Sequence, residues 1–551
     1  MKTKKAMKKI THIGMAALIA MGMLGTSCNK AESPEIETPE TQKENIVTLT
    51  TTVGFAADDT KALTDTGVKT FADGETMAVI YNNGTSTVKA VSHALEVSDI
   101  TDGGKKATFT FDLETPNKSE NVTYIYPAAM ANDDGAVNYA ALNSQDGTLT
   151  SLAANLDYCT KSGAWDGENL PTLTLENQLA ILAITLKNEA GTSDITGSTT
   201  KLTVSDGTNT YNVSRSAADG PIYVAIRPTS DASIGIAATS DSKGYYKILT
   251  TPKSYTASNG YSVSWRMTQG ANLSLLTAAY TAQNDDKLTG TLGRNVKVSI
   301  ADGAMVTLDG VSINASGSWT SGNYAGITCA GDATITLEGT NTVKGFANGY
   351  PGISVSSGKT LVINGTGELI ASSNGSYDTG SGGAGIGGGD NMNCGNIEIQ
   401  SGTVTATGNQ YGAGIGGGQN ANCGNITISG GTVTATGGYR AAGIGGGRRG
   451  VSGTSGKYDS GSCGNITISG GTVTATGGQN AAGIGGGRGN NNNYKSSCGT
   501  VTITSGVTSV TATKGSGADN SIGAGNVGTC GTVTIGGNVG AITTSPYTYQ
   551  P

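Results

Sequence analysis

The sequence has few charged residues, few aromatic residues and almost no histidine. Charged residues make up 14% and aromatic residues 5% of the 551 positions, a composition that excludes a helical, charge-rich enzyme. With 11 prolines and no Gly-X-Y period, the chain is neither collagen nor proline-rich disorder. The two histidines, His12 and His93, are too few for a catalytic triad or a histidine-based metal site. We therefore expect no enzyme activity, no catalytic residue, no metal site and no cofactor.

Glycine, threonine and β-branched residues are abundant instead. The 86 glycines are about 16% of the chain, against about 7% in an average protein. Glycine allows tight turns, and Thr, Val and Ile favour strands. The composition therefore predicts an all-β protein with many turns.

The N-terminal segment has the features of a secretion signal. Five lysines between positions 2 and 9 precede an apolar stretch, residues 10–24, and small residues then lead to Cys28. An uncleaved membrane anchor is the alternative, but about 15 apolar residues are too short for a confident span. The segment resembles the signal peptides of Bacteroidales lipoproteins. We expect a signal peptide over 1–27 and lipidation of Cys28.

Removal of residues 1–27 makes the chain strongly acidic. It takes away five lysines and no acidic residue, so 29 basic and 41 acidic residues remain, a net charge near −12. Nucleic acid is therefore excluded as a partner. The charge is uneven, because residues 380–551 carry seven Lys and Arg but only four Asp and Glu.

The first half of the mature chain contains a tether followed by short strands. Residues 28–45 are rich in Glu, Thr, Lys and Pro and have little to bury, which predicts an extended tether. From Ile46 to Thr268, segments with period-two alternation are separated by Gly, Asn and Asp turns. This pattern predicts one or two β-sandwiches, with a boundary near residues 166–170, so that two would span 46–165 and 166–268.

Four segments of this half resemble the fimbrillin family of Bacteroidales type V pilus proteins: Phe55–Val79, Tyr124–Pro127, Glu176–Leu186 and Tyr255–Tyr261. The resemblance implies transthyretin-like sandwiches, lipoprotein export and assembly with pilus subunits by donation of a strand to a neighbour's sheet. It also implies that a protease can cut after a basic residue near the first strand, here Lys61 or Lys69. Ordinary solvated loop charges are the favoured alternative for both lysines.

A repeat dominates the second half. The segment Cys423–Gly438 is repeated with an identical sequence at Cys463–Gly478. A nearly identical repeat begins at Cys394, and degenerate repeats begin at Cys498 and Cys530. From cysteine to final glycine (394–418, 423–447 and 463–487) the span is always 25 residues, whereas the connections to the next cysteine are 4, 15 and 10 residues long. A constant unit with insertions at one corner is typical of a parallel β-helix, which we expect over 275–545. With the segment Gly352–Val355 and its Gly-Ala-Gly-Ile-Gly-Gly turns, this half resembles bacterial β-helix carbohydrate-binding domains related to pectate lyases.

Two motifs within the repeat have more than one interpretation. The Gly-x-Gly-x-x-Gly segments at Gly383 and Gly412 precede no helix, so we interpret them as coil corners rather than dinucleotide sites. The cysteines of the repeat would stack in one column. Such a column can hold buried free thiols, the favoured interpretation, or one or two disulfides, or a metal.

Basic and aromatic residues occur in the corner segments of neighbouring coils. They can bind an acidic host or microbial glycan, because Arg and Lys pair with anionic groups and tyrosines stack on sugar faces. Solvated loops without a ligand are the alternative. The candidate glycan-binding residues are Arg448, Arg449, Lys457, Tyr458, Arg488, Tyr494 and Lys495. A second exposed column, with the same two interpretations, contains Gln410, Tyr411, Tyr439, Arg440, Gln479 and Asn480.

Together these features predict a lipid-anchored protein of the outer membrane, exposed on the cell surface or in fimbriae. We expect a fimbria-associated or pilus-tip adhesin whose β-helix is the binding or display module. The alternative is an outer-membrane-anchored polysaccharide-binding protein that never joins a pilus. A degenerate polysaccharide lyase is disfavoured, because the acidic residues that would hold calcium are scattered over different coils: Asp390, Glu398, Asp459 and Asp519.

Replacement of Cys28 tests the lipid anchor. Cys28→Ala removes the thiol that accepts the lipid, so the protein should accumulate unprocessed or in a soluble form. Metabolic labelling with a radioactive fatty acid measures the attachment. Label that persists on the Cys28→Ala protein would show that the lipidation site is elsewhere.

Overall fold

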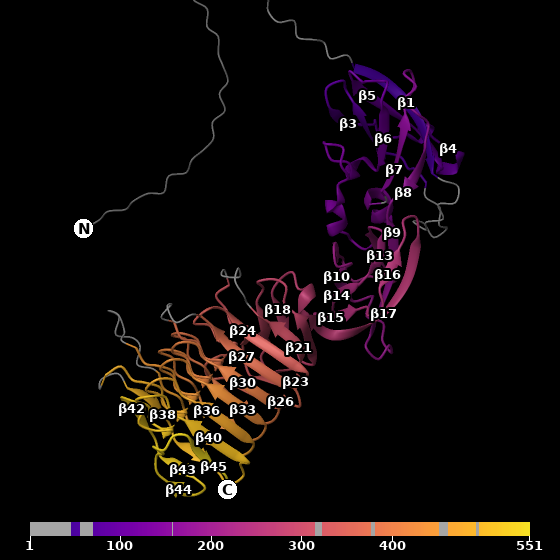
Figure 1. Cartoon of the computed structure of the whole chain (residues 1–551). Coiled ribbons are helices and arrows are strands. Elements are labelled where there is room, and N and C mark those ends of the chain that lie inside the picture. The colour runs from indigo at the N-terminus through magenta and orange to yellow at the C-terminus, as the bar shows by residue number, and fades with distance from the viewer. Residues whose placement is uncertain are drawn as a thin grey trace, which may run out of the picture. The chain divides into compact units, whose positions relative to one another are not determined.

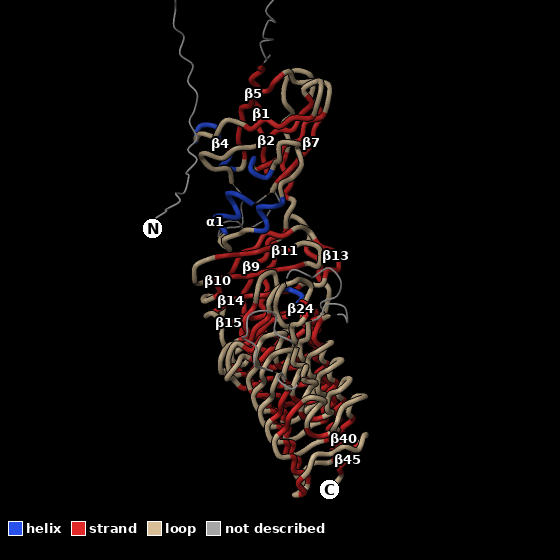
Figure 2. Tube along the Cα trace, turned by 90° about the vertical axis from the view of Figure 1, so that its left-hand side faces the viewer, coloured by secondary structure: helices blue, strands red, loops and turns tan. Residues whose placement is uncertain are grey.

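The computed structural model contains strands almost throughout and very little helix, which confirms the all-β prediction (Figure 2). The one α-helix among the described residues, α1 (Leu149–Ser151), has 3 residues. No helix in that part of the chain is long and apolar enough to cross a membrane. The signal peptide, the tether and Cys28 lie outside the described residues, which are 46–55, 70–156, 158–314, 322–375, 381–450, 461–491 and 495–551.

The first group of strands forms one eight-stranded sheet system, in the order β3-β2-β6-β7-β8-β1-β5-β4. Alternate residues of β5 are buried, and rings such as Phe109 and Tyr124 fill the core between the strands. The strands are β1 (Ile46–Phe55), β2 (Ala78–Asn82), β3 (Thr87–Val91), β4 (Ile100–Thr101), β5 (Lys106–Glu114), β6 (Asn121–Tyr126), β7 (Cys159–Ala164) and β8 (Thr174–Asn177).

The second group is arranged around β9 (Ala180–Asn188), which lies between β12 and β17 and is apolar along most of its length. Because β8 pairs with β7 and β1, the chain passes from the first group to the second after β8, C-terminal to the expected division at residue 166. The remaining strands are β10 (Thr199–Ser205), β11 (Thr210–Ser214), β12 (Ile222–Ile226), β13 (Thr229–Ala232), β14 (Gly235–Ser240), β15 (Lys243–Ile248), β16 (Lys253–Tyr255) and β17 (Gly260–Asn272).

The C-terminal part is a parallel β-helix with three columns of stacked strands (Figure 1). The first column is β19 (Asp286–Thr291), β21 (Ala304–Ile313), β23 (Ala333–Glu338), β26 (Thr360–Gly365), β29 (Asn396–Ile399), β32 (Ile426–Ile428), β35 (Ile466–Ile468), β39 (Val501–Ile503) and β43 (Val533–Ile535). The second is the end of β21, then β24 (Thr340–Asn348), β27 (Glu368–Asn374), β30 (Thr403–Thr407), β33 (Thr432–Thr436), β36 (Thr472–Thr476) and β40 (Ser509–Thr513). The third is β18 (Tyr280–Ala282), β20 (Val298–Ile300), β22 (Ile327–Cys329), β25 (Ile353–Val355), β28 (Ile386–Gly387), β31 (Ile415–Gly416), β34 (Ile444–Gly445), β37 (Ile484–Gly485) and β41 (Ile522–Gly523).

Identical residues stack on one another inside the coil. Ile426 pairs with Ile397 on one side and Ile466 on the other, as the repeat predicted, and all three are almost fully buried. In the second column, buried Val433 and Ala435 alternate with exposed threonines. The apolar ladder stabilises the helix because each coil buries its neighbours' side chains as well as its own.

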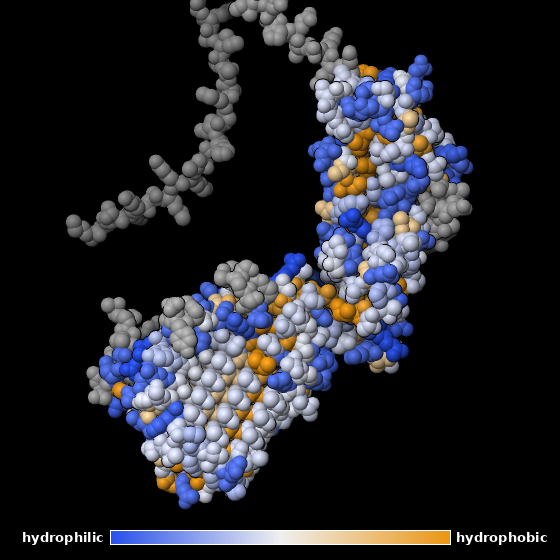
Figure 3. All heavy atoms as spheres, in the orientation of Figure 1, coloured by the Kyte–Doolittle hydropathy of each residue, from blue (hydrophilic) through white to orange (hydrophobic). Residues whose placement is uncertain are grey.

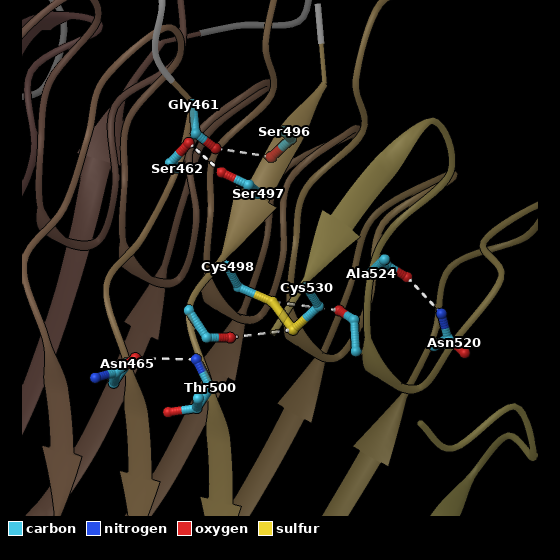
Figure 4. Close-up of a disulfide and its surroundings, with 12 residues drawn as sticks. Gly461, Ser462, Asn465, Ser496, Ser497, Cys498, Thr500, Asn520, Ala524 and Cys530 are labelled. Atoms are coloured by element: carbon cyan, nitrogen blue, oxygen red, sulfur yellow. Dashed lines mark hydrogen bonds between the residues drawn. A yellow bond between two sulfur atoms is a disulfide. The ribbon is translucent and has the colours of Figure 1, made fainter. Parts of the chain in front are cut away.

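An asparagine ladder fixes the same register at a corner. The side-chain Oδ1 of Asn396 accepts a hydrogen bond from the backbone N–H of Asn425 at 2.9 Å, and Asn425 accepts one from Asn465 in the same way at 2.9 Å. Asn465 in turn accepts from the N–H of Thr500, also at 2.9 Å (Figure 4). Each bond satisfies a corner N–H that would otherwise lack a partner in the strand pairing.

Glycine is required where the third column turns. Gly416 and Gly445 have φ of 128° and 130°, a region that other residues rarely adopt. A Cβ on Gly445 would also come too close to the carbonyl oxygen of Gly485 in the next coil. The Gly-x-Gly-x-x-Gly segment at Gly412, which includes Gly416, is therefore a corner of the coil, as the sequence indicated.

Strands from this chain cover both ends of the β-helix. Residues 260–267 of β17 pair with β9, and residues 270–272 of the same strand pair with β19 in the first coil. At the other end, β44 (Asn538–Val539) and β45 (Tyr547–Tyr549) pair antiparallel with β43 and β40. Covered edges cannot template pairing with another chain.

Replacement of one corner glycine should destabilise the whole β-helix. Gly445→Ala introduces backbone strain of roughly 1–3 kcal/mol in addition to the clash with the next coil. Gly293→Ala is the matched control, because no atom lies within 4 Å of its added Cβ. Denaturant titration followed by circular dichroism measures both. Equal midpoints for the two variants would contradict the role of the glycine column.

Candidate functional site

The structure describes four of the seven candidate glycan-binding residues. Lys457, Tyr458 and Tyr494 lie outside the described residues, as do the possible cleavage sites Lys61 and Lys69. Arg449 donates from Nη1 to the backbone oxygen of Lys495 at 3.0 Å. The guanidinium of Arg449 is therefore tied to the loop itself, whereas Arg448 and Arg488 belong to a different cluster.

The two corner columns that the sequence separated lie side by side across the glycine turn. The N–H of Arg448 donates to the carbonyl oxygen of Tyr411 at 2.9 Å, and the N–H of Arg488 donates to that of Arg440 at 2.9 Å. The constant spacing of eight residues between the columns, as from Arg440 to Arg448, was the available sequence signal. We call the five residues gathered here the Arg–Tyr cluster: Tyr411, Tyr439, Arg440, Arg448 and Arg488.

Each tyrosine of the Arg–Tyr cluster carries an arginine on its ring. The guanidinium carbon of Arg448 lies 4.3 Å from the ring centroid of Tyr411, and that of Arg440 lies 4.9 Å from the centroid of Tyr439. The two ring centroids are 6.5 Å apart. Stacking of this kind orients the guanidinium and leaves the N–H groups in its plane able to donate.

The cluster concentrates positive charge. Burial lowers the pKa of Arg448, and the charges of Arg440 and Arg488 lower it further, although a neighbouring tyrosine opposes the shift. Arginine stays protonated despite such shifts. Among the described residues, no carboxylate forms an ion pair with Arg440, Arg448 or Arg488.

In the earlier coils of the β-helix, stacked charged residues form ion pairs. Lys287 lies 2.9 Å from the carboxylate of Asp309 and 2.7 Å from that of Glu338, which belong to the next two coils. Lys359 likewise lies 3.1 Å from a carboxylate oxygen of Asp302. These ion pairs neutralise charge across the coils, whereas the Arg–Tyr cluster leaves it unbalanced.

Part of the β-helix surface is strongly polar. In Figure 3, strongly hydrophilic residues gather near β38 (Ser496–Cys498) and β42 (Gly528–Cys530), the strands labelled there in Figure 1. The face formed by β30, β33 and β36 is nearly neutral and is crossed by a narrow hydrophobic stripe. Its exposed residues are mainly threonines.

The acidic residues weighed for a lyase remain separate. Glu398 accepts a hydrogen bond from Gln400 at 2.8 Å, and burial raises the pKa of Asp390. Asp459 lies outside the described residues. Within the described ranges, no three His, Cys, Asp or Glu side chains are grouped as metal ligands would be.

The repeat cysteines form a column with two disulfides and one free thiol. Cys394 bonds Cys423 and Cys498 bonds Cys530, each with Cα atoms 4.6 Å apart. Figure 4 shows the disulfide between Cys498 and Cys530. Cys463 lies between the two pairs as a free thiol, and burial raises its pKa to about 12. The favoured interpretation of five free thiols is therefore wrong, because stacked coils bring neighbouring cysteines within disulfide reach.

A family model for the β-helix repeat matches residues 397–419, 426–448 and 466–488. Each match ends on the residue that follows the glycine turn, so two of them end at Arg448 and Arg488. The chain therefore contains β-helix repeats, as its sequence indicated. No curated protein is similar to the chain in sequence.

Solved structures similar to the chain are Bacteroidales adhesion and fimbrial proteins. A Bacteroides fragilis protein assigned to cell adhesion is 13% identical, with 39% of this chain and 87% of that chain covered and a TM-score of 0.24. A Bacteroides ovatus protein with the same assignment is 12% identical, with 41% of this chain and 96% of that chain covered and a TM-score of 0.26. A tip fimbrial protein from Porphyromonas gingivalis is 11% identical, with 41% of this chain and 98% of that chain covered and a TM-score of 0.20. At these TM-scores the likeness carries no argument about what this chain binds.

Alkylation can count the thiols that lie outside the two disulfides. In the soluble Cys28→Ala protein, denaturation without reductant should expose three such thiols, Cys159, Cys329 and Cys463. The native protein should react slowly, because all three are buried and the thiolate is the reactive form. Mass spectrometry after iodoacetamide treatment measures the count, and Cys463→Ser should reduce it by one. Labelling of seven cysteines without reductant would contradict the two disulfides.

Proposed function

We propose that this chain is a lipid-anchored surface protein that acts as a fimbria-associated or pilus-tip adhesin, with the β-helix as its binding or display module. The support from sequence is the lipoprotein-type signal before Cys28 and the fimbrillin resemblance of the first half. Pilus subunits are the proposed protein partners of that half, joined by strand donation. The lipid links the chain to the outer membrane.

The covered end of the β-helix is the observation that supports a position at the end of a pilus rather than inside its shaft. A subunit inside a shaft must offer a strand or an open sheet edge to its neighbour on each side. Here β45 is hydrogen-bonded to β40 of its own chain, and β44 covers β43. An assembly that includes this chain is therefore expected to end at its β-helix.

The alternative function is that of a polysaccharide-binding protein anchored in the outer membrane without a pilus. The Arg–Tyr cluster is compatible with it, because stacked arginines and tyrosines suit an anionic sugar with or without a pilus. The two functions differ in the partner of the first half of the chain and share the binding role of the β-helix.

Localisation on cells that make the protein distinguishes these functions. We expect immunogold labelling with an antibody against the β-helix to mark the ends of fimbriae, and the chain to co-purify with shaft subunits. The Cys28→Ala protein is the control for membrane attachment. Label confined to the outer membrane, with no shaft subunit recovered, would overturn the pilus role and leave the alternative.

A further inference from the structure

We propose that the Arg–Tyr cluster binds the sulfate ester groups of an anionic polysaccharide. The inference rests on the proposed binding role of the β-helix and names the chemistry of its ligand. The cluster differs from the set expected from sequence, because Tyr411, Tyr439 and Arg440 join it and Arg449 and Lys495 do not.

The first argument is the lack of counter-charge. The β-helix pairs Lys287 and Lys359 with carboxylates of neighbouring coils. The described residues provide no such partner for the three arginines of the cluster. Carboxylates are also scarce in this part of the sequence, because residues 380–551 as a whole are net basic. Three adjacent guanidiniums repel one another, and an anion between them removes that repulsion.

The second argument is the supply of hydrogen-bond donors. The Nε atoms of Arg440 and Arg488 are buried, and no acceptor among the described residues is within hydrogen-bond distance of them. A buried donor without an acceptor is unfavourable. An oxyanion bound at the cluster places negative charge beside both guanidiniums and offsets part of that cost.

The third argument selects the type of anion. A carboxylate has two oxygens in one plane and matches a single guanidinium fork. The backbone of Arg440 lies on one side of the glycine turn and those of Arg448 and Arg488 lie on the other, with the guanidiniums of Arg448 and Arg440 over the rings of Tyr411 and Tyr439. A sulfate ester has three peripheral oxygens that point in different directions, so it can accept from all three arginines.

The surroundings favour a sugar as the carrier of that group. The rings of Tyr411 and Tyr439 provide apolar surface on which a pyranose can pack. Gln419 and Asn420 lie in the same corner, since the N–H of Asn420 donates to the carbonyl oxygen of Arg448 at 3.0 Å. Side-chain amides of this kind can donate to and accept from sugar hydroxyls.

Three forms of one polymer test the proposal on the purified, soluble Cys28→Ala chain. Dextran sulfate, carboxymethyl dextran of equal charge density and unmodified dextran share a backbone and differ only in the anion. Calorimetry should give the tightest binding to dextran sulfate, at least tenfold weaker binding to carboxymethyl dextran, and none to dextran. Binding should weaken as salt rises, because charge pairs are screened.

Substitutions then assign the binding to the cluster. The triple variant Arg440→Gln, Arg448→Gln and Arg488→Gln should lose at least tenfold in affinity for dextran sulfate. The charge-matched control, Lys201→Gln, Lys253→Gln and Arg294→Gln, removes three charges elsewhere and should bind like the parent. The lysine variant, Arg440→Lys, Arg448→Lys and Arg488→Lys, keeps the charge but loses the planar fork, so it should also bind several-fold more weakly.

Three outcomes would overturn the inference. These are equal affinity for the two anionic dextrans, full binding by the lysine variant, or an equal loss in the charge-matched control. Circular dichroism and thermal melts verify that each variant is folded. Because the assay uses purified protein, its failure leaves the fimbrial localisation result intact, and a failed localisation does not alter the binding result.

Discussion

The structure depends on the register of the stacked coils. Parallel strands lie about 4.8 Å apart, so each side chain of one coil lies on its counterpart in the next. The buried isoleucines at 397, 426 and 466 form one ladder, and the asparagines at 396, 425 and 465 form another. A one-residue slip would turn every inward side chain outward. The constant 25-residue unit is the sequence form of this constraint.

Because of this register, a residue type that recurs at one position of the repeat forms a column along the β-helix. Stacked glycines allow the close approach at the third column, and stacked cysteines form two disulfides. Stacked charges are neutralised around Lys287 but accumulate at Arg448. A parallel β-helix therefore converts a single residue of its repeat into a surface feature of several residues. This property suits a binding or display module, because repetition gives many weak contacts with one extended ligand.

The covered ends of the β-helix are the second feature that limits how the chain can bind a partner. The strand β17 belongs both to the second group of sheets and to the first coil, so the start of the β-helix is hydrogen-bonded to the preceding fold. At the other end, β44 and β45 reverse direction and cover the last coils. Without these strands the stacked edges would be open to pairing with other chains. The covered edges limit the surfaces through which the chain can meet a partner.

The sequence alone determined the β-helix, its inward isoleucines and its glycine corners, because an exact repeat leaves one stacking register that buries the apolar residues. It did not determine the state of the cysteines, since pairing depends on distances between coils rather than on spacing along the chain. Nor did it show that Arg440 and Arg448 share one cluster, although eight residues separate them. Only the tertiary structure decided this, because the glycine turn folds the chain back and places the N–H of Arg448 on the carbonyl oxygen of Tyr411.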